Sequence, residues 1–362
     1  MSDCLFHIVQ TPNKGTLTAQ ADDLLRQIEM LHQQEKSRGR ELFQMRIYVT
    51  DAANQCEVLR NHPLVVRFAP LGVVSFIEQP PLGGGKVAVL LWYFEGKMEG
   101  RTVENTPEGT CLTLRMDGLA YILHTVRFGA EATALSAEEQ TRKAFETHIA
   151  LLRSRGMNLK DHCQRTWIYV RDVDRHYAGV VKARNEVFAR EGLTADSHFI
   201  ASTGIGGSTE HREALVAVDF FSVEGLPQER ISYLEALEFL NPTHEYGVAF
   251  ERATRVDLPG HSMNLVSGTA SIDAKGECVH RGDVICQTGR LLMNIDKLLA
   301  SGGSSLRDVR YFLVYLRDVA DYPAVRDYMR LRFPHTPCLV TLGRVCRPEW
   351  LIEMECIATE PY

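Results

Sequence analysis

The sequence predicts an α+β protein made of three tandem ββαβαβ units. Two observations support this prediction. The stretch from His261 to Ala358 has the pattern of a hairpin followed by helix, strand, helix and strand. A Tyr-x-x-Asp signature, or a weaker form of it, also occurs three times at regular distances. Because a domain typically holds about 150 residues, a chain of 362 has room for two or three such units.

The elements of the last unit follow from its apolar spacing. An alternating run and a polar turn predict the hairpin. Apolar residues then recur at the spacing of one helix face, and Gly302 and Gly303 end that helix. The expected elements are strand 263–268, turn 273–276, a helix from 284 to the Gly302 stop, strand 309–316, helix 318–333 and strand 350–358.

The repeat extends this unit over the whole chain. The signature that begins at Tyr315 recurs at Tyr169 and, more weakly, at Tyr48. Gln287 and Gly303 follow Gln140 and Gly156 at one offset (287 − 140 = 147 and 303 − 156 = 147). Steady offsets are typical of an internal repeat. The three units are expected at residues 1–97, 110–224 and 245–362, and the first is the most degenerate.

The segments between the units are expected to be connections. Residues 95–109 have no apolar period, so we expect a linker there. Residues 225–247 are expected to cross into the last unit, with a short helix over 233–240. The closing strands of the three units are expected at 87–94, 215–221 and 351–358.

Composition excludes several classes of function. A net charge of −6 and a pI of about 6.1 give no general attraction to phosphate backbones, so nucleic acid is an unlikely partner. No apolar run approaches the roughly 18 residues of a membrane span, and the first residues lack a signal-peptide pattern, which predicts a cytoplasmic protein. Nine cysteines without a C-x-x-C pair favour reduced thiols. The histidines have no metal-site spacing, so neither a metal nor a cofactor is expected.

Several short motifs of the last unit resemble the YjgF/RidA family, which is also called endoribonuclease L-PSP. They are Ser267-Gly268, Gly282-Asp283-Val284, Gln287-Thr288, Asn294, Gly302-Gly303, Tyr315 to Val319, Phe333-Pro334 and Ile352 to Glu355. The resemblance implies a chorismate-mutase-like fold and a homotrimer with a ligand cleft at each interface. Three units in one chain would then form a covalent pseudo-trimer with three unequal clefts. A monomer would be sufficient.

The closing strand of the last unit contains the candidate catalytic residue. Its period of two places Glu353 and Glu355 on one face, away from the helices. A solvated strand face is the plain alternative. In the resemblance to RidA enzymes, Glu353 stands where those proteins keep the glutamate that handles water and protons. A carboxylate in a partly dry cleft acquires the raised pKa that this role needs.

One position departs from the RidA pattern. RidA deaminases carry an arginine for the substrate carboxylate fifteen residues before that glutamate, where this chain has Cys338. A cysteine cannot form a bidentate ion pair, so Cys338 marks a changed substrate-binding position. A small core thiol is the alternative for this residue.

The middle of the chain resembles the chorismatases, which hydrolyse chorismate. The matching pieces are Arg165 to Val170, Ala201 to Gly207, Tyr246-Gly247 and Phe250 to Thr254, while a longer insert after Tyr246 is missing here. The glycine-rich turn 203–207 offers backbone N–H groups to an anion, and arginines offer forked donors. A plain loop, surface ion pairs and a core tyrosine are the alternatives. The residues assigned to substrate binding are Arg165, Tyr169, Thr203, Gly204, Gly206, Tyr246 and Arg252.

These observations predict a chorismatase-like hydrolase or lyase that acts on a small anionic metabolite through Glu353. The closing strand 87–94 has no carboxylate, and only 351–358 has a Glu-x-Glu pair, so one cleft is expected to carry the chemistry. A RidA-type enamine or imine deaminase is the first alternative. A non-catalytic small-anion-binding protein is the second, and RNA cleavage ranks last.

Overall fold

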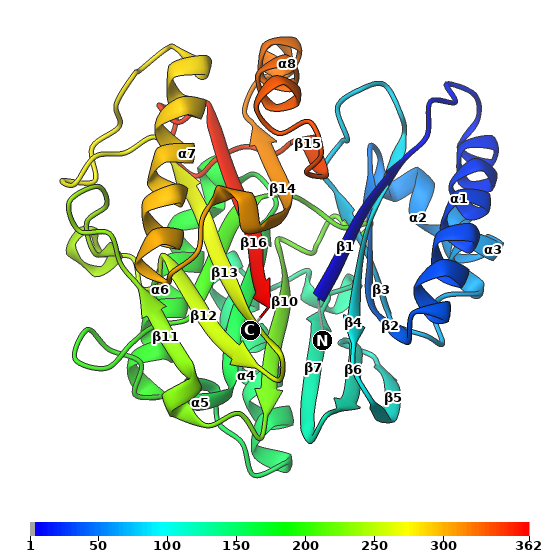
Figure 1. The fold of residues 1–362 in the computed structure, drawn as a ribbon, viewed down its shortest axis with the longest axis horizontal. Coiled ribbons are helices and arrows are strands. Elements are labelled where there is room, and N and C mark those ends of the chain that lie inside the picture. The colour runs from blue at the N-terminus through cyan, green and yellow to red at the C-terminus, as the bar shows by residue number, and fades with distance from the viewer. Residues whose placement is uncertain (1–3, 362) are drawn as a thin grey trace.

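The chain folds into three mixed β-sheets that face one another, with helices on their outer sides (Figure 1). A computed structural model describes residues 4–361. The predicted α+β class with three sheet-and-helix units is confirmed.

The first sheet has the order β1-β4-β2-β3. Its apolar strands alternate between two cores: Val89 and Leu91 of β4 pack under the helices, whereas Leu90 and Trp92 face the other sheets. Thr16 caps the long helix and Asp51 caps the next one. The elements are β1 (Cys4–Gln10), α1 (Leu17–Ser37), β2 (Arg40–Val49), α2 (Ala52–Arg60), α3 (Pro63–Val66), β3 (Val73–Glu78) and β4 (Val87–Glu95).

The second sheet has the order β5-β6-β7-β10-β8-β9. Its first strand corrects the expected linker, because residues 98–106 pair with β6 along the edge of this sheet. The polar composition that suggested a linker belongs to an exposed edge strand. The elements are β5 (Met98–Thr106), β6 (Gly109–Met116), β7 (Leu119–Val126), α4 (Ala137–Ser154), α5 (Leu159–His162), β8 (Cys163–Val170), α6 (Val173–Arg190), β9 (Ala201–Gly206) and β10 (Val216–Glu224).

The third sheet has the order β11-β12-β13-β16-β14-β15. The helix expected over 233–240 is wrong: Ile231–Leu234 is an edge strand and turns follow it. Its apolar residues pack as an edge strand beside β12 instead of forming a helix face. The elements are β11 (Ile231–Leu234), β12 (Ala253–Leu258), β13 (His261–Ala270), α7 (Val284–Ser301), β14 (Val309–Leu316), α8 (Tyr322–Arg332), β15 (Cys338–Leu342) and β16 (Ile352–Pro361).

The register of the closing strands relates the three units residue by residue. The signature tyrosines Tyr48, Tyr169 and Tyr315 pair with Ala88, Ala217 and Glu353, respectively. The residues equivalent to Glu353 in the first and second units are therefore both alanines.

A shared core joins the sheets at the centre. The ring centroids of Trp92 in the first sheet and Phe221 in the second lie 5.0 Å apart, and those of Phe6 and Tyr311 of the third sheet lie 4.8 Å apart. Aromatic contacts of this kind add to the burial energy that holds the units together. The sheets therefore form one packed body.

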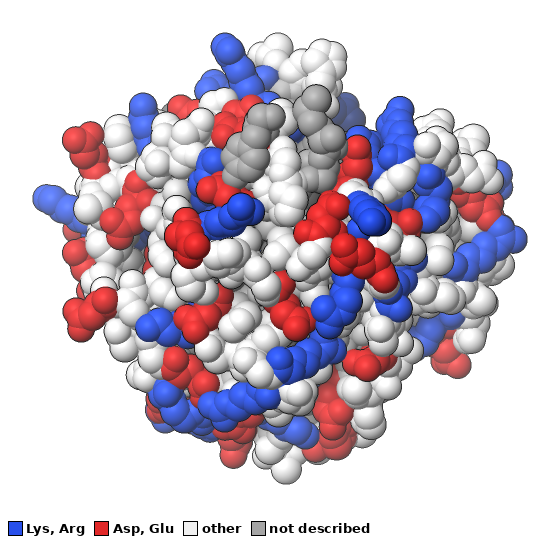
Figure 2. Space-filling view, turned by 60° about the horizontal axis from the view of Figure 1, so that its bottom comes forward, with Lys and Arg blue, Asp and Glu red and all other residues white. Residues whose placement is uncertain are grey.

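The charged residues are mixed over the surface. Figure 2 shows Lys and Arg interspersed with Asp and Glu on the face it presents, with no broad region of one sign. Across residues 4–361, none of the helices combines the length and apolar character that a bilayer span needs.

Candidate active site

A cavity of about 350 Å³ lies between the second and third units. Helix α6 and strand β9 form one wall, and the ends of β13 and β16 form the other. Loops 246–252 and 346–350 close it. Residues of chemical interest on its surface are Tyr177, Arg184, Ser202, Gly204, Tyr246, Arg252, Gly268, Cys346, Arg347, Trp350 and Glu353.

Glu353 is the carboxylate of this cavity. It lies on β16, pairs with Tyr315 and Ala270, and is 4% exposed. Burial, together with the charge of Glu355, raises the pKa of Glu353 to about 8, against the opposing effect of Arg165 and Arg252. Within residues 4–361 its side chain makes no hydrogen bond and no ion pair. A carboxyl group in this state is neutral at pH 7 and can donate a proton.

Glycine makes room for this carboxyl group. A Cβ atom on Gly268 would overlap Glu353 Oε1. Across the cavity, a Cβ atom on Gly204 would lie 2.8 Å from Tyr177 Cε2. Both positions therefore require a residue without a side chain if the present packing is kept.

Three arginines supply the positive charge. Arg184 of α6 is buried, and its Nε and Nη2 atoms have no hydrogen-bond partner among residues 4–361. Arg252 donates to the Asn241 carbonyl at 2.9 Å, and Arg347 lies 4.8 Å from the Trp350 ring. Burial lowers the pKa of Arg184 and of Arg252, yet a guanidinium remains a cation. An unpaired buried cation is costly unless an anion joins it, so this wall suits an anionic ligand.

Two further groups beside Glu353 stay neutral. Burial raises the pKa of the Tyr177 hydroxyl well above its ordinary value. Burial likewise raises the pKa of the Cys346 thiol to about 12. Neither group is ionised near pH 7, so both offer polar contacts without charge.

A polar network lies directly behind the cavity wall. Arg165 donates to Glu355 at 3.0 Å, and Trp167 Nε1 donates to the same carboxylate at 2.8 Å. The Thr203 hydroxyl donates to Glu355 at 2.5 Å and accepts from the Gly268 N–H at 2.9 Å. This network fixes the backbone next to Glu353.

The last unit of this chain is similar to known proteins. The family described as Endoribonuclease L-PSP matches residues 257–360. The 3-aminoacrylate deaminase RutC of Acinetobacter baylyi is 38% identical over 109 residues, which cover 29% of this chain and 82% of that protein. This chain belongs to the YjgF/RidA (L-PSP) family.

Two further similarities reach beyond the last unit. A 3-hydroxybenzoate synthase of Streptomyces hygroscopicus is 28% identical over 241 residues, which cover 60% of this chain and 68% of that protein. A crystal structure of a chorismatase matches the whole fold with a TM-score of 0.67 and 19% identity, covering 99% of this chain and 98% of the other. The three-unit architecture is therefore chorismatase-like.

The structure places the predicted site residues in three groups. The first group lines the cavity and consists of Glu353, Gly204, Tyr246 and Arg252. The second group, Arg165 and Thr203, lies behind the cavity wall and contacts Glu355. The remaining three, Tyr169, Gly206 and Cys338, lie elsewhere. Arg165 was predicted to lie opposite Glu353, but its guanidinium donates to Glu355 at 3.0 Å.

The first two residues of the remaining group lie away from the cavity for clear reasons. Tyr169 is fully buried in the central core, where the Arg46 guanidinium lies 5.7 Å from its ring. Gly206 donates its N–H to the Arg344 carbonyl at 2.8 Å. The glycine-rich turn predicted over 203–207 is largely strand β9, so most of its N–H groups are not presented as an anion-binding loop.

Cys338 belongs to a different cleft from Glu353. It begins β15, pairs with Phe312 of β14 and lines the groove between the third and first units. The position equivalent to Cys338 in the second unit is Ser202, which does line the Glu353 cavity. The cavity thus has a serine, Ser202, at the strand position where RidA deaminases carry an arginine. Arg184 enters this cavity from α6 instead.

Sequence reasoning missed Arg184, Tyr177 and Arg347. One signal was present for the first: Arg184 falls on the apolar face of α6, between Val180 and Val187. A lone arginine on the buried stripe of a helix indicates a buried polar site. No comparable pattern marked Tyr177 or Arg347.

Proposed function

We propose that this chain is a chorismatase-like hydrolase or lyase that acts on a small cyclic carboxylate in the cavity between its second and third units. The observation that supports this most is the presence in one cavity of a neutral, unbonded Glu353 and of the buried guanidinium of Arg184, whose Nε and Nη2 atoms have no hydrogen-bond partner among residues 4–361. The first can transfer a proton, and the second requires an anion.

Different residues of the cavity bind the substrate and transfer the proton. Arg184, Arg252 and Arg347 bind the carboxylate groups of the substrate, and the wall around Trp350 contacts its ring. A volume of about 350 Å³ suits a small metabolite. Glu353 then donates its proton to an electron-rich atom of the bound substrate, and its conjugate base takes a proton back from water or from the substrate.

The relatives support the substrate class. The 3-hydroxybenzoate synthase and the chorismatase carry names that refer to ring carboxylates, and the latter matches the chain along almost its entire length. Chorismate, with two carboxylates and one ring, is accordingly the first substrate to test. The count of three arginines fits a dianion better than a neutral ligand.

The test is consumption of chorismate by the purified protein, followed by chromatography of the products between pH 5 and 10. Turnover is expected to fall about tenfold per pH unit above pH 8, because the proton donor is then lost. A rate that rises with pH through this range would contradict a proton-donor role. Chorismate binding without turnover would indicate a binding protein.

A RidA-type deaminase is the second candidate. It is favoured by the 38% identity to a 3-aminoacrylate deaminase in the last unit. Release of ammonia from an enamine generated in the assay mixture distinguishes it from the first proposal. The absence of arginine at both Cys338 and Ser202 argues against it, since the carboxylate of a small amino-acid-derived substrate would have no arginine from the strand and would depend on arginines from α6 and from the loops.

A further inference from the structure

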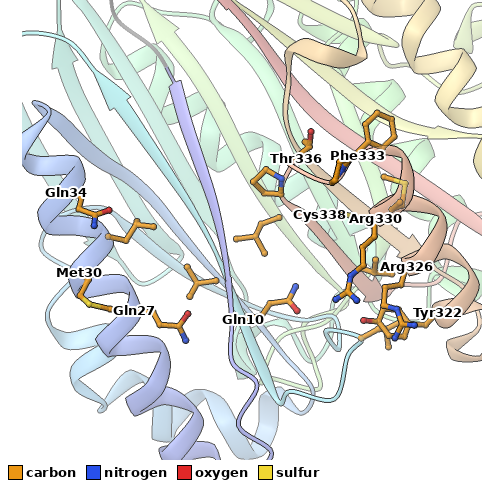
Figure 3. A pocket seen from close by; sticks show the side chains of 18 residues that line it. Gln10, Gln27, Met30, Gln34, Tyr322, Arg326, Arg330, Phe333, Thr336 and Cys338 are labelled. Atoms are coloured by element: carbon orange, nitrogen blue, oxygen red, sulfur yellow. The ribbon is translucent and has the colours of Figure 1, made fainter.

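A second cavity of the described chain is larger than the one that contains Glu353. It is a groove of about 720 Å³ between α1 of the first unit and α8 of the third, shown in Figure 3. Strands β1 and β15 form its floor. The proposed reaction makes no use of this groove.

Pseudo-threefold symmetry makes this groove the counterpart of the Glu353 cavity. Val340 of β15 occupies the place of Gly204, because each residue directly precedes the partner of a signature tyrosine. Arg330 and Arg184 follow their signature tyrosines, Tyr315 and Tyr169, at the same distance along the chain (330 − 315 = 15 and 184 − 169 = 15). A helix arginine therefore lines each cavity, buried as Arg184 in the first and exposed as Arg330 in the second.

The catalytic position does not have an equivalent. Ala88 stands at the position of Glu353 in the first unit. Leu82 lines the groove, and its N–H donates to the Val340 carbonyl at 2.8 Å. No aspartate or glutamate of the described part of the chain lines the groove. A ligand bound here would meet no proton-transferring carboxylate.

The charge of the groove is a single uncompensated cation. Arg326 is paired with Asp327 at 2.7 Å, whereas Arg330 forms no ion pair with any residue in the range 4–361. In Figure 3 the Arg330 side chain extends toward Gln10 across the groove. Cys338 adds no charge, because burial raises the pKa of its thiol to about 12.

The remaining surface is apolar with amide groups. The apolar side chains include Ile8, Met30, Leu31, Met329, Phe333 and Val340. Gln10, Gln27 and Gln34 provide uncharged hydrogen-bonding groups. Such a surface suits a ligand with an apolar body and one anionic end.

We propose that the groove between α1 and α8 is a second, non-catalytic site that binds an apolar monocarboxylate, with its carboxylate on Arg330 and its body against Met30, Met329 and Phe333. The planar guanidinium forms two parallel hydrogen bonds to a carboxylate. One cation selects one negative charge, in contrast to the three arginines around Glu353.

Methionine methyl resonances test this site directly. Met30 and Met329 line the groove, and among residues 4–361 no methionine lines the Glu353 cavity. Benzoate titrated into protein labelled with ¹³C-methyl methionine should shift these two resonances, which are assigned with Met30→Leu and Met329→Leu. Benzyl alcohol, which has the same ring without charge, should bind at least about tenfold more weakly.

Two variants complete the experiment. Arg330→Gln should weaken the benzoate-induced shifts by about tenfold or more, and the exposed control Arg307→Gln should leave them unchanged. Both positions are exposed, so folding is expected to be unaffected. Equal binding of benzoate and benzyl alcohol, shifts that survive Arg330→Gln, or no shift of either methyl resonance at saturating benzoate would each overturn the proposal.

Discussion

Arg165 of the second unit and Glu355 of the third form an ion pair of 3.0 Å, and each side chain is 1% exposed. Trp167 and Thr203 complete the hydrogen bonds of the carboxylate. The pair therefore joins two sheets at the centre of the molecule and supports the strand that carries Glu353. A buried pair of this kind is costly to break, because the remaining charge has no water to stabilise it.

Replacing Arg165 with Met should lower the free energy of unfolding by about 3–5 kcal/mol, because Glu355 is left buried without its cation. Urea unfolding followed by tryptophan fluorescence measures this change. The control is Arg190→Met, whose exposed pair with Glu146 is worth less than about 1 kcal/mol. Similar losses in the two variants would show that the buried pair has no special role.

The stability contributed by Glu353 should fall as pH rises. The pKa of Glu353 is raised in the folded state from 4.5 to about 8, so the folded protein binds this proton more tightly than the unfolded chain does. Its contribution is therefore lost between about pH 4.5 and 8. Glu353→Gln should remove this slope, so that wild type loses at least about 1 kcal/mol relative to the variant over that range. Parallel curves of unfolding free energy against pH would contradict the raised pKa.

Arg184→Met should raise the stability of the ligand-free protein and weaken substrate binding. The guanidinium is buried with two N–H groups unpartnered, so its removal relieves a desolvation cost. Loss of one charge-assisted contact should raise Kd about tenfold or more. Thermal unfolding and calorimetry measure the two effects, with the exposed Arg175→Met on the same helix as the control. A variant that is less stable and still binds normally would show that Arg184 is structural.

Gly268→Ala should reduce turnover with little effect on folding. The added methyl group would overlap the Glu353 carboxyl group and force it to move. A displacement of this size at a proton donor costs about a hundredfold in rate. Gly100→Ala is the matched control, since a Cβ atom there meets nothing within 4 Å. Equal kcat in both variants would show that the position of Glu353 is not critical.

Much of the fold could be predicted from the sequence. The helix spacing around Leu291 and Leu298 and the recurring tyrosine signatures are local patterns, and the structure has helices and strands at those places. The edge strands β5 and β11 could not be recognised, because edge strands are polar or short and resemble loops in a single sequence.

The candidate site was predictable only in part. Period-two alternation identified the face of Glu353, but it could not show which arginine lies opposite. Arg165 and Arg184 both lie in the second unit, and only the packing of β8 and α6 against the third unit assigns one to Glu355 and the other to the cavity. Such assignments depend on contacts between residues far apart in the chain.

The role of Glu353 in proton transfer is tested most directly by the turnover of chorismate. Wild type is compared with Glu353→Gln, and Glu360→Gln on the same strand is the control. Glu353→Gln should bind chorismate in calorimetry nearly as well as wild type, and its turnover should be reduced at least about a hundredfold. Glu360→Gln should behave like wild type, because Glu360 lies outside the cavity. Wild-type turnover in Glu353→Gln would contradict the central claim that this carboxyl group transfers the proton.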